Sequence, residues 1–150
     1  MEAVEIVSTM TSDQELLAAA ALHDTVEDTD VTVEQIREEF GDRIASIVAA
    51  ESDDTESSLS WRERKQLALN KLASAPRDVK IVAMGDKLSN MRAIARDYAK
   101  QGDEFWNLFH VKNKSDHAWR YRGLVEALRD LNGTAAFEEF ERLVNQVFNG

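Results

Sequence analysis

A histidine and four carboxylates occur close together in the stretch LLAAAALHDTVEDTD. His23 and Asp24 directly follow an apolar run, and Glu27 and Asp28 come about one helical turn later. Imidazole and carboxylate ligands suit divalent ions such as Mn, Fe, Zn or Mg. Adjacent helical residues point about 100° apart, so we expect the helix to end here and let both side chains reach one ion. A His-Asp pair alone is a weak motif, and the alternative is a histidine at a helix dipole beside solvated acids.

A second candidate metal ligand is Asp86, in the stretch VKIVAMGDKLSNMRAI. Asp86 and Asn90 share one helical face with four apolar residues, Val79, Val82, Ala83 and Ala93. A buried carboxylate binds a cation or pairs with a basic residue. Lys87 points to a different face, so we do not expect it to be that partner. We predict that Asp86 binds a metal and that Asn90 hydrogen-bonds a substrate.

The two acids after Asp24 suggest acid–base chemistry rather than further metal ligands. If Glu27 and Asp28 both bound the ion, the site would carry excess negative charge. We predict instead that they orient and deprotonate a water molecule acidified by the ion. Asp30 remains open as the N-cap of the following helix. Arg92, two residues after Asn90, has two open roles, which are contact with a substrate phosphate and an ion pair with an acid.

Helix signals recur along the chain, whereas strand-like alternation is scarce. Capping boxes are predicted at Ser12–Glu15, Thr32–Gln35 and Ser60–Glu63, and Gly41 is predicted to end the second of these helices. Pro76 suits the first turn of a long helix that ends near Gly102. Further helices are predicted over 103–109, 115–131 and 135–148, and a loop over 52–60. The sequence therefore predicts one all-α domain, residues 1–150, with about eight helices.

Composition narrows the classes of function. The 150 residues are 43% hydrophobic and 31% charged, which is typical of a globular domain. No apolar run approaches the roughly 18 residues of a membrane span, so no membrane association is expected. The net charge of −10 argues against nucleic-acid binding. Cysteine is absent, which excludes thiolate ligands and fits a cytoplasmic protein.

The combination of HDTVEDTD with GDKLSNMRAI resembles the HD-domain hydrolases of the RelA/SpoT type, which include small stand-alone alarmone hydrolases. The segments SWRERKQLAL and AWRYRGLVEAL extend the resemblance over nearly the whole chain. It implies an all-α HD bundle and Mn²⁺-dependent removal of the 3′-pyrophosphate from guanosine 3′,5′-bis(diphosphate) (ppGpp). By this resemblance, three of four metal ligands are matched, Glu27 and Asp28 match a catalytic acid pair, and Asn90 matches a nucleoside contact. The matched ligands are His23, Asp24 and Asp86.

The resemblance also has a departure at its start. The family's first metal ligand, a histidine in a His-Pro step, would fall immediately before Met1, so we expect an N-terminally shortened HD domain with weaker metal affinity. His110 and His117 lie in segments that match non-ligand regions, and we do not expect either to substitute. Gly85 and Ser89 stand where Ala and His are common in relatives.

Two alternative functions stay open. The chain could hydrolyse another nucleotide, or it could be a nucleotide-sensing or interaction module without turnover. Divalent ions other than Mn²⁺ and self-association also remain open.

Overall fold

The chain folds as an all-helical bundle around one long helix. The computed structural model describes residues 2–50, 58–109 and 113–149, and the side chains of Asp24 and Glu27 lie outside the described part. Within these ranges there is no β-strand. The α-helices are α1 (Glu2–Ser8), α2 (Gln14–Asp28), α3 (Val33–Phe40), α4 (Asp42–Ala50), α5 (Trp61–Ala73), α6 (Arg77–Gln101), α7 (Lys114–Ala127) and α8 (Ala135–Phe148). Two 3₁₀ segments, η1 (Gly102–Leu108) and η2 (Arg129–Leu131), complete the described elements. The predicted fold class is therefore confirmed.

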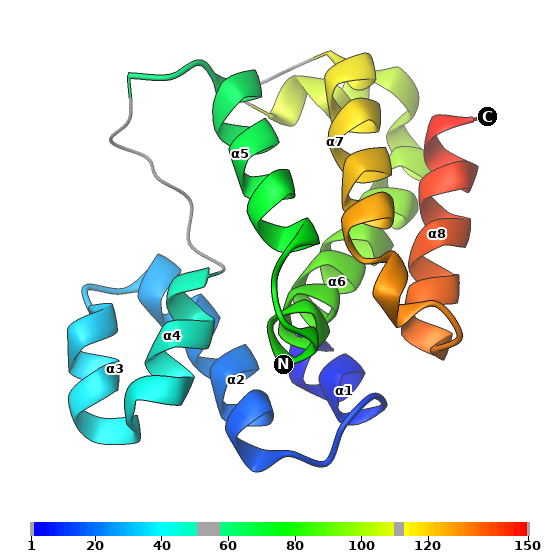
Figure 1. Cartoon of the computed structure of the whole chain (residues 1–150). Helices are drawn as coiled ribbons and strands as arrows, with labels where there is room; N and C mark the ends of the chain where they lie inside the picture. Colours follow the sequence, from blue (N-terminus) through cyan, green and yellow to red (C-terminus); the bar gives the residue numbers. More distant parts are fainter. Residues whose placement is uncertain (1, 51–57, 110–112, 150) are drawn as a thin grey trace.

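Helix α6 is the centre of the arrangement. It contacts α1 and α2 on one side and α8 on another, while α3 packs on α4, and α5 packs on α7. Figure 1 shows α1–α4 gathered at one end of the molecule and α5, α7 and α8 at the other, with α6 joining the two groups. The core is continuous between them and includes the fully buried Met84, Leu88 and Met91 of α6. No described helix is both long and apolar enough to cross a membrane.

Several predicted helix ends are confirmed by their capping contacts. Thr32 forms the complete capping box with Gln35, and Ser60 accepts the Glu63 amide 3.2 Å away. Gly41 ends α3 at a φ of 97°, in the left-handed region that glycine tolerates best. The helix predicted over 135–148 matches α8. Most of the predicted loop over 52–60 lies outside the described residues.

One predicted cap is wrong, and one cap left open is not formed. The N-cap of α2 is Asp13 rather than Ser12, because the Asp13 carboxylate accepts the Glu15 amide 3.0 Å away. Asp30 does not cap α3, since Thr32 fills that position. The error shifts the start of α2 by one residue and does not change the order of the elements.

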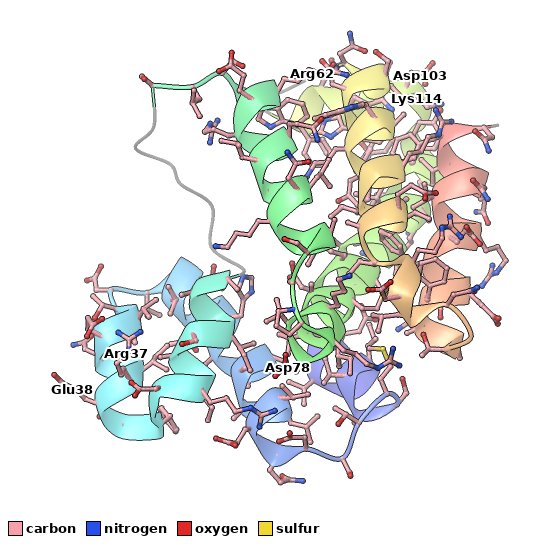
Figure 2. The ribbon with its side chains drawn as sticks, viewed as in Figure 1. Arg37, Glu38, Arg62, Asp78, Asp103 and Lys114 are labelled. Carbon is pink, nitrogen blue, oxygen red and sulfur yellow. The ribbon has the colours of Figure 1, made fainter. Side chains whose placement is uncertain are left out.

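An ion-pair cluster fixes the starts of three helices against one another. Arg43 of α4 lies 2.9 Å from Asp13 before α2, 2.9 Å from Glu15 in α2 and 3.5 Å from Asp78 in α6. Figure 2 labels Asp78 at the lower end of the α6 region, toward the α1–α4 group. The hydrogen bond from Arg43 holds the pKa of Asp13 below its ordinary value. These contacts orient α2 and α6, which carry the candidate site residues.

Candidate metal and nucleotide site

His23 of α2 and Asp86 of α6 converge across the interface between their helices. His23 Nδ1 lies 4.0 Å from Asp86 Oδ1. His23 is only 4% exposed, and the Asp86 side chain is 19% exposed. The sequence separates these residues widely, and the structure brings them together as predicted.

Small side chains allow this convergence. Ala19 and Ala20 are buried on α2, and Ala83 is buried on α6. A small pocket lies where α1, α2 and α6 meet, and it is lined by Ala3, Ala20, His23, Val82 and Asp86. One wall of the pocket is therefore polar, and the remainder is apolar.

The position of His23 and Asp24 within α2 corrects the sequence-based expectation. The helix does not end at this pair but continues to Asp28, and Thr29 is its C-cap. Neither glycine nor proline interrupts the segment, so helical hydrogen bonding continues through the acids. Consequently Glu27 lies one turn after His23 on the same helical face, whereas Asp24 is rotated by about 100° from His23. Asp28 is exposed at the end of the helix.

The contact between Lys87 and Asp86 corrects a second expectation, that Lys87 would not be the partner of this carboxylate. Its Nζ donates a hydrogen bond to Asp86 Oδ2 at 3.1 Å, although the two residues are neighbours on one helix. The long, flexible lysine side chain bends back along the helix surface, so the direction of its Cα–Cβ bond does not exclude the contact. The sequence reading missed Lys87 as a site residue, and its adjacency to Asp86 was the available signal.

The two predicted substrate-binding residues lie further along α6. Asn90 is exposed, one turn after Asp86, so the polar face runs from the pocket to the surface. Arg92 forms a two-pronged ion pair with Glu139 of α8, with N–O distances of 2.6 and 2.7 Å. Its Nη1 lies 3.5 Å from Glu2 of α1. The acid-pairing role considered for Arg92 is therefore present in the structure.

His23 and Asp86 fit a divalent ion in donor chemistry and approximately in spacing. Bonds of about 2.0–2.2 Å place two atoms bound to one ion about 3.0–3.5 Å apart. The observed 4.0 Å between Nδ1 and Oδ1 requires only a small side-chain rotation. Among the described side chains, which do not include those of Asp24 and Glu27, no group of three potential ligands converges. The pair thus supplies two donors, and Asp24 remains the predicted third.

His117, the late histidine that the structure describes, packs in an aromatic cluster away from this site. His117 of α7 is buried, and its ring stacks on Trp106 with centroids 4.9 Å apart. It also contacts the rings of Trp61 and Phe109. This aromatic cluster is built from α5, α7 and the η1 segment with its C-cap Phe109, which follows the C-terminal end of α6, whereas Asp86 lies within α6. His110 lies outside the described residues.

Comparisons with known proteins agree with this architecture. The chain is 36% identical over 128 residues to the guanosine-3′,5′-bis(diphosphate) 3′-pyrophosphohydrolase MESH1 of Danio rerio, an alignment that covers 85% of this chain and 65% of the relative. The chain thus spans less than two thirds of that relative's length.

Two solved structures share the fold. The crystal structure of lmo0812 from Listeria monocytogenes EGD-e matches with a TM-score of 0.87 and 28% identity, over 99% of this chain and 97% of the other. A structure described as a metazoan ortholog of SpoT that hydrolyses ppGpp matches with a TM-score of 0.74 and 25% identity, over 97% of this chain and 77% of the other. A family model described as the HD domain matches residues 1–111. The chain belongs to the HD domain family.

Proposed function

We propose that this chain is a metal-dependent phosphohydrolase that removes the 3′-pyrophosphate from ppGpp. The observation that carries the proposal is the approach of His23 to Asp86, from two helices, within an HD domain. The names of the similar proteins, which describe ppGpp pyrophosphohydrolases, support the choice of substrate. A cytoplasmic location remains part of the proposal.

His23, Asp24 and Asp86 are the proposed metal ligands, and Mn²⁺ is the proposed ion. When bound, a divalent ion polarises a phosphoryl oxygen and lowers the pKa of water. The location of His23 and Asp86 at a pocket supports this assignment, because neither donor is fully exposed to competing solvent.

Glu27 and Asp28 are the proposed acid–base pair. Glu27 follows His23 by one helical turn, and Asp28 ends the same helix. A carboxylate beside the metal ligands can orient a water molecule by accepting its hydrogen bond and can then take its proton. We assign these two functions to the pair jointly.

Asn90 and Arg92 are the proposed substrate contacts. The exposed carboxamide of Asn90 can both donate and accept, which suits a guanine base or a ribose hydroxyl. Arg92 has two of its nitrogens paired closely with Glu139, so Nη1, the atom with the longest contact, is its proposed donor to a phosphate.

The proposal is tested by measuring pyrophosphate release from ppGpp during a Mn²⁺ titration. GTP, which lacks a 3′-pyrophosphate, serves as the comparison nucleotide. We expect Mn²⁺-dependent release of pyrophosphate from ppGpp but not from GTP. Asp86→Ala should abolish this release. Asp97→Ala, which changes another acid on α6, should preserve it.

Two other results would contradict the proposal. Binding of ppGpp without turnover, in this chain and in a variant with His-Pro added before Met1, would indicate a sensing module. Preferential hydrolysis of GTP would indicate an HD phosphohydrolase with another nucleotide substrate.

A further inference from the structure

One face of α6 receives the short helix α1. Gly85 and Arg92 are seven residues apart, two turns of helix, and therefore share this face. Gly85 lies under the middle of α1, and Arg92 reaches Glu2 at its start. Gly85 lies against Ala3 itself, which lines the pocket of His23 and Asp86, and Arg92 contacts the residue before it in α1.

The absence of a side chain at Gly85 allows the backbones of α1 and α6 to approach closely. A Cβ atom at this position would lie 2.6 Å from Val7 Cγ2 and 2.8 Å from the Ala3 carbonyl oxygen. Both distances are shorter than real Cβ contacts. The Val7 methyl can move with its rotamer, but the Ala3 oxygen belongs to the backbone and moves only if α1 moves. Glycine is otherwise unfavourable inside a helix, and this close approach explains its presence within α6.

Arg92 ties the same face of α6 to two other helices. Nε and Nη2 bind both carboxylate oxygens of Glu139, a paired geometry that fixes the guanidinium plane. Nη1 then points to Glu2, with a 3.5 Å separation. Glu139 on α8 therefore orients the arginine that contacts the start of α1.

Helix α1 depends on these contacts for its position. It contains only seven residues, too few for a helix to be stable in water without packing. Its buried side chains, Ile6 and Val7, face the core, and Ala3 forms part of the pocket wall beside His23 and Asp86. A shift of α1 would therefore change the space around the proposed metal ligands.

We propose that Gly85, Arg92 and Glu139 are positioning residues that seat α1 on α6 and thereby shape the pocket at His23 and Asp86. Gly85 sets how closely α1 approaches, and the Glu139–Arg92–Glu2 chain of ion pairs sets where α1 begins. This inference rests on the proposed function in one respect, that the pocket holds a divalent ion.

The first experiment compares Gly85→Ala with Gly123→Ala. Gly123 on α7 is the matched control, since a Cβ there would also meet an atom at 2.6 Å, but that atom is the flexible Cδ1 of Leu69, in α5. Hydrogen–deuterium exchange at the amides of α1 reports whether α1 is seated. Calorimetric titration with Mn²⁺ alone reports the state of the pocket. We expect Gly85→Ala to speed exchange in α1 but not in α8 and to weaken Mn²⁺ binding about tenfold, the size of effect seen when support of a metal ligand is lost.

The second experiment changes a partly exposed side chain instead of a buried glycine. Glu139→Gln removes the charge that orients Arg92, and Glu138→Gln changes its exposed neighbour as the control. We expect faster α1 exchange and weaker Mn²⁺ binding in Glu139→Gln alone. This variant decides the matter if Gly85→Ala fails to fold.

The outcomes separate the two proposals. Unchanged α1 exchange in Glu139→Gln and Gly85→Ala would overturn the seating role, and faster exchange with unchanged Mn²⁺ affinity would overturn the link to the pocket. Failure of the unaltered chain to bind Mn²⁺ would overturn the proposed metal site and the link between α1 and that site. The exchange rates in α1 would still test whether Gly85 and Glu139 seat α1 on α6.

Discussion

Lys87 Nζ donates to one carboxylate oxygen of Asp86, and the other oxygen faces His23. The distances are 3.1 Å from Nζ to Oδ2 and 4.0 Å from His23 Nδ1 to Oδ1. The lysine thus restricts rotation of the carboxylate and leaves Oδ1 directed toward the imidazole. Hydrogen bonds to a ligating carboxylate orient it for a metal.

Loss of the Lys87 hydrogen bond should therefore weaken metal binding without removing a ligand. We expect Lys87→Met to raise the Kd for Mn²⁺ by about 10- to 100-fold, the range for groups that support ligands. Calorimetric titration measures the change, and Lys100→Met, at an exposed position late in α6, is the control. Equal affinities in the two variants would show that Asp86 needs no support from Lys87.

Glu27→Gln tests the division between metal binding and proton transfer. The substitution keeps the size of the side chain but removes a base. We expect Mn²⁺ affinity to stay within about twofold while kcat for ppGpp falls about 10²- to 10⁴-fold, the usual contribution of general acid–base catalysis. Titration with Mn²⁺ and steady-state pyrophosphate release measure the two quantities on one preparation. A parallel loss of metal binding would make Glu27 a ligand and refute its role as a base.

Local signals predicted much of the fold. The Ser60 cap, the Thr32 capping box and the helix-ending Gly41 act within a few residues of chain, so their effects can be read from neighbours. The helix predicted over 135–148 coincides with α8, whose buried residues follow one face. The predicted end of α2 at the His23–Asp24 pair is wrong because it rests on the chemistry of the pair, whereas no residue there breaks a helix.

The site was predictable only in part, because its remaining contacts are tertiary. The pairing of Arg92 with Glu139 joins residues 47 apart, and only the packing of α6 on α8 brings them together. Similarly, Ala3 carries no chemical signal, yet it lines the pocket because Gly85 admits α1. The contact of Lys87 with Asp86 depended on a flexible side chain, which helical periodicity does not describe.

Lys80 provides a test of what stabilises the centre of the bundle. The residue is 2% exposed, and its Nζ donates to Asp130 Oδ2 at 2.5 Å and to the Ala73 carbonyl at 3.0 Å. Asp130 is 72% exposed, so water can solvate its charge if the lysine is replaced. We therefore expect packing of the aliphatic chain to matter more than the ion pair.

Two substitutions at this position separate the contributions. We expect Lys80→Ala to lower the free energy of unfolding by about 2–4 kcal/mol, because it leaves a cavity. Lys80→Met retains the length of the side chain and should cost about 1 kcal/mol, from the lost hydrogen bonds. Urea denaturation of both variants at neutral pH measures the difference, and equal losses would show that the ion pair dominates.

Acid should weaken the attachment of α8 to α6 through Glu139. Hydrogen bonds from Arg92 hold the pKa of Glu139 below its ordinary value of 4.5, and the charge of Arg142 acts in the same direction. A carboxylate whose pKa is lowered by folding contributes stability above its unfolded pKa and loses that contribution as pH falls through its folded pKa. We therefore expect the stability difference between the unaltered chain and Glu139→Gln to be largest near pH 7 and to shrink from about pH 4.5 downward. Urea denaturation at several pH values measures this difference, with Glu138→Gln as the control. A difference that stays constant down to about pH 3 would show that the charge of Glu139 contributes nothing to the attachment, because protonation would then remove no stabilising interaction.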